Sequence, residues 1–268
     1  MLLSSLVNGL SLDALKANEL DARHTQLQPR DIQRFPSFAW TGGQVVGPQF
    51  ASATADVIIP NITFPYGYNA SARYTSSVWV GIGGDQNVCD DWGIPNAGGL
   101  IQVGYYYLYN PEGDFGVFAF YEWWPEPPVL LDNTEGIVTN IGDHVRMTVT
   151  QKGNTTGTVI WENLTTKEKF TRDIKAGVNG TLCANHAEWM IESFMTEENH
   201  ETQFPDFGEL RFNNIKATSV AGEQASLADS ILLAAEPIMG SGKQLARCDI
   251  IQPDATTCKW LGYEGMFD

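Results

Sequence analysis

The sequence predicts an all-β domain of antiparallel strands, preceded by a short helical leader. From Phe38 onwards, hydrophobic residues occur in short alternating runs, which is the pattern of half-buried strands. Turn signals rich in Gly, Asp and Asn separate these runs, and no amphipathic helical pattern lies between them. Many short strands without intervening helices indicate antiparallel sheets, packed as a sandwich or closed as a barrel.

The leader is the one extended stretch with a helical pattern. Residues 9–34 have leucines near helical spacing and are rich in residues that favour helix, until Phe35-Pro36 interrupts the pattern. We expect residues 1–36 to be a leader or propeptide and residues 37–268 to be the domain. The alternative is a terminal helix packed on the domain.

The expected strands follow in chain order, with turns at 83–85, 111–114, 142–143 and 153–154. They are 78–82, 117–121, 144–150, 158–162, 210–213 and 230–233.

Composition limits the class of protein and its partners. The chain has 268 residues, of which 43% are hydrophobic and 11% aromatic, enough for one large domain and too many for global disorder. No run of 18 apolar residues is present. Residues 37–268 carry 12 basic and 28 acidic residues, which accounts for the net charge of −16. We therefore expect no nucleic-acid partner and no membrane partner, because both need clustered Lys and Arg.

The acidic surface has two explanations. It would lose charge in acid, which suits a protein that works there, and it would equally serve ordinary solubility.

Cysteines and sequons favour an oxidising, extracellular compartment. Four cysteines without a C-x-x-C pair allow three pairings. Five N-x-S/T sequons begin at Asn61, Asn69, Asn154, Asn163 and Asn179. The first eight residues lack the basic and apolar regions of a strong signal peptide. We expect a secreted protein. Either its export uses a weak signal or the true start is missing from this sequence, and we favour the second explanation.

Several catalytic signatures are absent from the sequence. There is no G-x-S-x-G, H-E-x-x-H, P-loop or D-[TS]-G motif. His186-Ala187-Glu188 matches half of a zinc deaminase signature, but the required P-C-x-x-C is missing and an all-β pattern contradicts that fold. We expect no metal.

Carboxylates and amides beside aromatic residues remain as candidates. Gln102, Glu122 and Glu188 each lie within an otherwise apolar or aromatic strand. A position on the solvent-facing side of its strand would explain each of these polar residues taken singly. If buried, such a carboxyl group has a raised pKa unless partners stabilise its charge. Glu122 and Glu188 could also be the acid and nucleophile of a glycoside hydrolase, and spacing alone does not separate these possibilities.

Seven motifs, taken in order from about Phe38 to about Ser219, resemble those of the fungal glutamic peptidases (eqolisins), acid peptidases insensitive to pepstatin. Those motifs are Ala39-Trp40-Thr41-Gly42-Gly43, Trp79-Val80-Gly81-Ile82, Leu100-Ile101-Gln102-Val103-Gly104, Ala119-Phe120-Tyr121-Glu122-Trp123-Trp124-Pro125, Glu162-Asn163-Leu164-Thr165-Thr166, Leu182-Cys183 with Ala187-Glu188-Trp189, and Phe204-Pro205-Asp206-Phe207-Gly208.

The resemblance implies a lectin-like β-sandwich of two large antiparallel sheets and a catalytic dyad of Gln102 and Glu188. Glu188 would act as general base and then general acid, and Gln102 would donate to the oxyanion. No cofactor is implied, the substrates would be proteins or peptides, and we expect a monomer. The residues expected to bind substrate are Trp40, Trp79, Tyr106, Phe120, Glu122 and Trp123.

The resemblance also implies a disulfide pair. The family pairs the Cys after W-V-G-I-D-G with the Cys before the catalytic Glu, which corresponds to Cys89–Cys183. Cys248 and Cys258 would then pair locally.

Four departures from the family pattern affect the expected cleft. Gly83 replaces the Asp of W-V-G-I-D-G, Tyr106 lies where the family has an Asp nearby, and Phe120 replaces a Trp. The loop 83–99 is also longer than usual. We expect altered specificity, and the alternative is an inactive relative that binds peptide or polysaccharide in the same cleft.

Overall fold

The computed structural model describes residues 32–65, 74–84, 89, 93–94, 98–109, 115–131, 135–193, 204–236 and 242–262. Residues 1–31 and residues 32–268 are separate units of the chain. The expected leader helix thus lies outside the described residues up to residue 31. Arg34, the last residue of the predicted helix, is instead the first residue of strand β1 (Arg34–Ser37). The predicted boundary between leader and domain, at residue 36, therefore falls within β1.

The described chain is almost entirely β-structure, with one 3-10 turn, Leu227–Asp229. After β1 the strands are β2 (Trp40–Val46), β3 (Phe50–Ile58), β4 (Tyr74–Gly83), β5 (Leu100–Tyr109), β6 (Phe115–Trp124), β7 (Val129–Leu131), β8 (His144–Gly153), β9 (Thr156–Asn163), β10 (Glu168–Lys175), β11 (His186–Glu192), β12 (Glu209–Ser219), β13 (Ser230–Ala235), β14 (Ala246–Gln252) and β15 (Ala255–Trp260).

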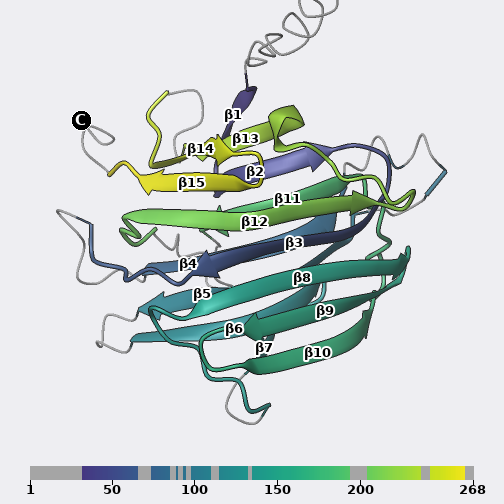
Figure 1. Cartoon of the computed structure of the whole chain (residues 1–268), viewed down its shortest axis with the longest axis horizontal. Coiled ribbons are helices and arrows are strands. Elements are labelled where there is room, and N and C mark those ends of the chain that lie inside the picture. Colours follow the sequence, from purple (N-terminus) through teal and green to yellow (C-terminus); the bar gives the residue numbers. More distant parts are fainter. Residues whose placement is uncertain are drawn as a thin grey trace, which may run out of the picture. The chain divides into compact units, whose positions relative to one another are not determined.

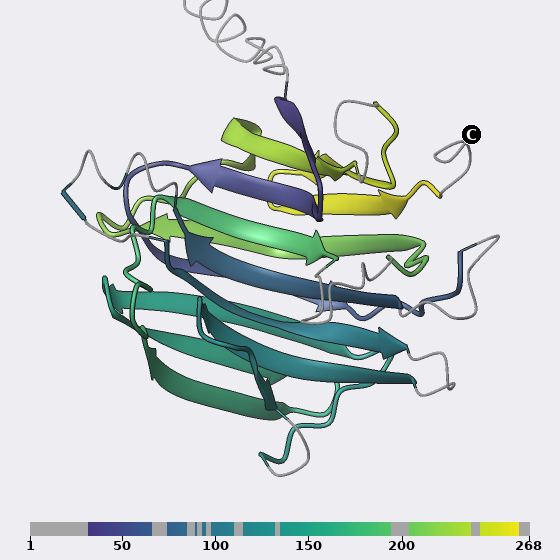
Figure 2. The same ribbon diagram turned by 180° about the vertical axis from the view of Figure 1, so that it is seen from behind.

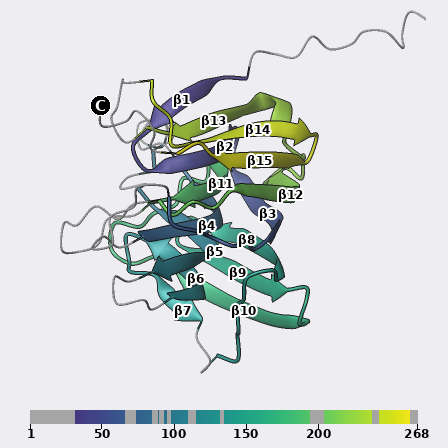
Figure 3. The same ribbon diagram turned by 90° about the vertical axis from the view of Figure 1, so that its left-hand side faces the viewer.

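The strands form one continuous path that folds into two packed layers. The order is β10-β9-β8-β3-β12-β15-β14-β13-β2-β11-β4-β5-β6-β7, and every pairing along it is antiparallel. Strand β1 adds to β13 in parallel. Figure 1 labels the strands, and Figure 2 shows the opposite side of the fold. In Figure 3 the layer with β4, β5 and β6 faces the layer with β3, β8 and β9. The predicted all-β sandwich class is confirmed.

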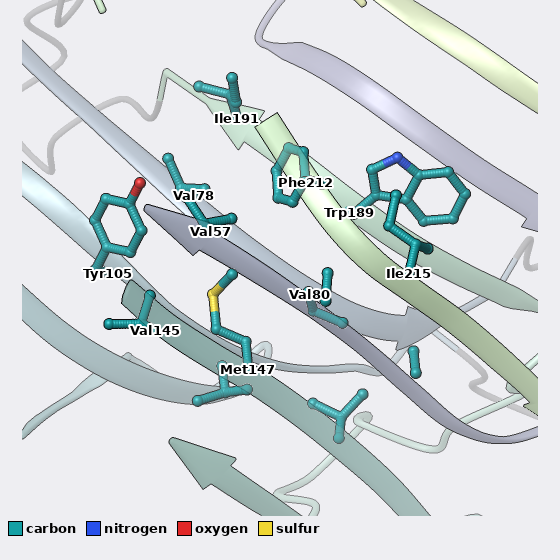
Figure 4. Packing of buried hydrophobic residues seen from close by; sticks show 14 of the residues in the cluster. Val57, Val78, Val80, Tyr105, Val145, Met147, Trp189, Ile191, Phe212 and Ile215 are labelled. Carbon is teal, nitrogen blue, oxygen red and sulfur yellow. The ribbon is translucent and has the colours of Figure 1, made fainter. Parts of the chain in front are cut away.

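The core lies between the two layers and follows from strand alternation. In β8, Val145, Met147 and Val149 are fully buried, whereas the residues between them are only partly buried. Figure 4 shows Val145 and Met147 beside Val78 and Val80 of the facing layer, and Val149 belongs to the same buried cluster. Burying one such side chain contributes about 1.5–3 kcal/mol.

Strand β4 is buried along its whole length, because the core covers one face and side chains of the other face are also shielded. It lies between β11 and β5 and therefore places its neighbours' polar residues at the centre of a sheet.

Both disulfides implied by the resemblance are formed in the structure. Cys89 bonds Cys183, 94 residues away, and Cys248 bonds Cys258 across the β14–β15 pair. The first bond ties the segment between β4 and β5 to the residues just before β11. Closing a loop of this length stabilises a fold by about 4–5 kcal/mol in the chain-entropy model.

The sequons differ in accessibility. Asn61 and Asn179 are exposed, which suits a glycan, and Asn69 lies outside the described residues. Asn163 is fully buried, and its Nδ2 donates a hydrogen bond to Oδ2 of Asp143 at 2.8 Å. In the folded domain this sequon cannot carry a sugar, which corrects the expectation at that position.

An ion pair between the partly exposed Arg146 and the buried Asp56 lies on the outer face of the second layer. Asp56 is 1% exposed and receives hydrogen bonds from Arg146 Nε at 2.6 Å and Nη2 at 2.7 Å. Asn214 donates a further bond at 2.9 Å. Burial alone would raise the pKa of Asp56, but the hydrogen bonds from Arg146 and Asn214 and the Arg146 charge hold it below its usual value.

Replacing Arg146 with Met should lower the free energy of unfolding by roughly 2–3 kcal/mol near pH 6, because the Asp56 carboxylate loses its main partner while staying buried. Since the folded pKa of Asp56 is lowered, its stabilisation is present above about pH 4 and lost as the pH falls further. Urea unfolding at pH 6 and pH 2.5 measures this.

The matched control is Lys152→Met, which removes an exposed ion pair with Asp173. That change should cost at most about 1 kcal/mol. Equal losses in the two variants, or a loss in Arg146→Met that does not shrink in acid, would contradict the assignment.

Candidate active site

A cleft lies on the outer face of the layer that contains β2, β11, β4, β5 and β6. Its volume is about 870 Å³. Alternate residues of these strands form its surface, together with residues that follow β4 and β6. The lining residues are Trp40, Gln44, Thr75, Ser77, Gly83, Gly84, Gly98, Gly99, Leu100, Gln102, Tyr106, Leu108, Phe120, Glu122, Trp124, Pro128, Leu130, His186, Glu188 and Glu192.

One row of cross-strand partners crosses the middle of the cleft, and we call it the central row. Gln44 pairs with Glu188, Glu188 with Gly81, Gly81 with Gln102, and Gln102 with Glu122. Glu188 and Gln102 are thus two strands apart, which corresponds to about 10 Å between Cα atoms.

Gly81 lies between Glu188 and Gln102 in the central row, where neighbouring side chains leave no room for a Cβ. A Cβ at this position would lie 2.9 Å from Trp79 Cζ3, 2.9 Å from Leu100 Cδ1 and 3.1 Å from the backbone oxygen of Ile101. No side chain fits there without displacing its neighbours.

Glu188 and Gln102 are both buried, at 4% and 5% exposure. Oε1 of Glu188 lies 3.3 Å from Nδ1 of His186. Nε2 of Gln102 donates a hydrogen bond to Oε2 of Glu122. Within the described part of the chain, Oε2 of Glu188 and Oε1 of Gln102 have no hydrogen-bond partner.

Two further carboxyl groups in the cleft have raised pKa values. Burial raises the pKa of Glu122 to about 7, against the hydrogen bond from Gln102, and the charge of Glu192 adds to the rise. Burial also raises the pKa of Glu192, although Trp40 and Trp79 donate hydrogen bonds to it, and the charge of Glu188 raises it further. Both groups therefore favour the neutral form more than an exposed glutamate does.

The predicted aromatic residues divide between the cleft and the layers beneath it. Trp40, Tyr106 and Phe120 line the cleft as expected. Trp79 lies below, where its ring packs edge-to-face on Trp40 at 5.7 Å and its Nε1 donates to Glu192 at 2.8 Å. It supports the cleft but does not line it.

Trp123 is placed wrongly by the sequence-based prediction. It points into the core between the layers, where Nε1 donates to the backbone oxygen of Gly180 at 2.7 Å. The next residue, Trp124, is 54% exposed and lines the cleft instead. Consecutive residues of a strand face opposite sides, so only one of this pair can reach the cleft.

Sequence reasoning missed two cleft residues on β11. It considered His186 only as a zinc ligand and gave Glu192 no role. The signal was available, because His186, Glu188 and Glu192 fall on one face at even spacing along the strand. His186 is the one cleft-lining residue among the described positions that can carry a positive charge.

The two-glutamate glycosidase arrangement finds no support in this geometry. Glu122 and Glu188 are three strands apart, about 14 Å between Cα atoms, and Gln102 lies between them in the central row. Among the described residues, no group of three His, Cys, Asp or Glu side chains could hold a metal ion. No helix in that part of the chain has the length and apolar content needed to span a membrane.

The departures from the expected motifs change the rim of the cleft. Gly83 pairs across the strands with His186, so the position of the missing acid faces an imidazole. Tyr106 packs against Phe118 and Phe120, with ring centroids 5.4 Å and 6.1 Å away. Burial raises the pKa of Tyr106, so its hydroxyl stays neutral. Most of the long 83–99 loop lies outside the described residues.

Comparisons place these features among known proteins. The peptidase A4 family model matches residues 39–260. Aspergillopepsin-2 of Aspergillus niger is 29% identical over 194 residues, which cover 67% of this chain and 64% of that protein. Scytalidopepsin B of Scytalidium lignicola is 30% identical over 229 residues, covering 83% and 74%.

The fold agrees with that of a solved structure. The crystal structure of scytalido-glutamic peptidase with a transition state analog inhibitor has a TM-score of 0.66 and 25% identity, covering 85% of this chain and all of that one. Together with the sequence matches, this confirms the resemblance that the motifs predicted.

Replacing Gln102 with Leu should raise the pKa of Glu122 further above 7, because the hydrogen bond from Gln102 stabilises the ionised form. Replacing Glu192 with Gln should lower it, since a nearby negative charge is removed. The side-chain carboxyl carbon of Glu122, followed by NMR from pH 4 to 9, reports both shifts. Movement of either pKa in the opposite direction would refute the arrangement.

Proposed function

The chain belongs to the peptidase A4 family, and we propose that it is a secreted acid endopeptidase in which Glu188 activates water and Gln102 stabilises the oxyanion. The observation that carries the proposal is the central row. It sets the buried Glu188 carboxyl group and the buried Gln102 amide on either side of a glycine, and Oε2 of Glu188 has no hydrogen-bond donor among the described residues.

The reaction proceeds through one water molecule held between the dyad. The water oxygen attacks the peptide carbonyl carbon while its proton passes to Glu188, which gives a tetrahedral intermediate. Glu188 then returns that proton to the leaving nitrogen as the C–N bond breaks. An N–H of Gln102 donates to the oxyanion, and one such donor is worth about 10²–10³ in rate. His186 fixes the position of the Glu188 carboxylate through the 3.3 Å contact.

Peptide is the substrate that the cleft fits best. The side of the cleft formed by β5, β6 and β7 is apolar and aromatic, with Leu100, Phe120, Trp124 and Leu130. This surface suits the hydrophobic side chains of an extended peptide. The related scytalido-glutamic peptidase was crystallised with a transition state analog inhibitor, which supports ligand binding in this fold. Without the paired aspartates of the pepsin type in its sequence, the enzyme should be insensitive to pepstatin.

The remaining features support secretion. Two disulfides and exposed sequons at Asn61 and Asn179 suit an oxidising, glycosylating route. Residues 1–36 would be the leader of a zymogen. We propose a monomer without nucleic-acid or membrane partners, in keeping with the net charge of −16.

Cleavage of a denatured protein between pH 2 and 7, with pepstatin present, tests this function. Wild type should cleave in the acid range. Glu188→Gln should abolish cleavage because no general base remains, and Gln102→Ala should reduce kcat by about 10²–10³. Glu162→Gln is the matched control, since Glu162 lies on β9 and pairs with Lys169. Unchanged cleavage by Glu188→Gln would refute the proposal.

Gly81→Ala tests the space between the dyad. The added Cβ must displace Trp79 or Leu100, so kcat/KM should fall at least about tenfold. In Gly83→Ala the Cβ meets only the Leu100 side chain below 3.4 Å, at 3.1 Å, and the loss should be smaller. Equal kcat/KM values for Gly81→Ala and wild type would show that the space is not needed.

A further inference from the structure

We propose that Glu122 is a positioning residue that decides which end of the Gln102 amide faces Glu188. The proposal rests on the proposed function, because it concerns the donor role of Gln102. It depends on a direct contact, since Gln102 and Glu122 are cross-strand partners on neighbouring strands and their side chains are hydrogen bonded.

The two protonation states of Glu122 require opposite orientations of the amide. An ionised carboxylate only accepts hydrogen bonds, so it binds Nε2 of Gln102 and leaves Oε1 on the other side. A protonated carboxyl group has an O–H that can donate to Oε1. The amide then turns by half a rotation about its last bond, and its N–H groups face the Glu188 side of the central row.

Only the second orientation turns the amide donor fully towards the oxyanion. In the first, the buried Oε1 has no hydrogen-bond partner among the described residues, and an oxygen facing a developing oxyanion would repel it. In the second, the O–H of Glu122 satisfies Oε1. Protonation of Glu122 therefore gives the buried Oε1 of Gln102 a hydrogen-bond donor. The same rotation of the amide turns its N–H groups towards the oxyanion.

The surroundings of Glu122 favour its protonated form. It shares the cleft with the carboxyl groups of Glu188 and Glu192 and the imidazole of His186 on β11, and with Gln102 and Tyr106 on β5. The described lining of the cleft contains no Lys or Arg. The other cleft-lining residues of β6 and β7 are Phe120, Trp124 and Leu130, none of which carries a charge. With a pKa of about 7, Glu122 is mostly protonated below neutral pH, which confines the donor orientation to acid.

The pH dependence of kcat/KM in Glu122→Gln and Glu122→Leu tests the proposal. A glutamine at position 122 can donate to Oε1 at every pH, so the ratio of kcat/KM at pH 8 to that at pH 5 should rise at least fivefold over wild type. Leucine removes the same charge but cannot orient the amide, so kcat should fall at both pH values. An unchanged ratio in Glu122→Gln, or equal profiles in the two variants, would overturn the proposal.

A second measurement does not depend on activity. The side-chain amide protons of Gln102, identified in NMR spectra by their absence in Gln102→Leu, should shift with a midpoint near pH 7 in wild type and stay constant in Glu122→Gln. A titrating amide in a protein without peptidase activity would leave the positioning role standing and remove the proposed function. An active enzyme whose amide does not titrate would remove the positioning role alone.

Discussion

The register between β11, β4, β5 and β6 is the constraint on which the site depends. Because side chains alternate between the two faces of a strand, a slip of one residue would bury Glu188 in the core and expose Trp189. The core face resists such a slip, since Trp189, Val80 and Val103 are all fully or almost fully buried against the second layer. The Cys89–Cys183 bond anchors the chain next to the same strands. Hydrophobic packing on one face thus fixes the polar chemistry on the other.

The buried carboxyl groups of the site lower the free energy of unfolding at neutral pH, and they lower it less in acid. Glu122 has a folded pKa of about 7 against an ordinary value of 4.5, so the folded state binds more protons than the unfolded chain between these values. Stability from this group therefore rises as the pH falls from 7 to 4.5, by on the order of 3 kcal/mol. Asp56 acts in the opposite sense, since its pKa is lowered and its contribution fades only in stronger acid. The cleft and the ion pair together favour a fold that is most stable in mild acid.

Local patterns predicted the strands and the family, but the direction of individual side chains depended on pairing. Alternation in β8 and the motif around Gln102 were readable because each lies within a few residues. Trp123 and Trp124 could not be separated, because which of them faces the cleft depends on how β6 pairs with β5. The strand that overlaps the predicted leader boundary was not readable from the sequence for the same reason. Arg34–Ser37 becomes a strand only by pairing with β13, about 200 residues later in the chain.

The neutral amide at position 102 explains how three carboxyl groups can share one cleft. A carboxyl group there would place like charges on adjacent strands beside Glu122, and none of the described lining residues is a Lys or Arg that could offset them. An amide has a donor at one end and an acceptor at the other, so it can bond Glu122 in either protonation state. It also separates Glu122 from Glu188 by a group without net charge. The glutamine is therefore suited to the centre of this row as a spacer between acids, in addition to its role as a donor.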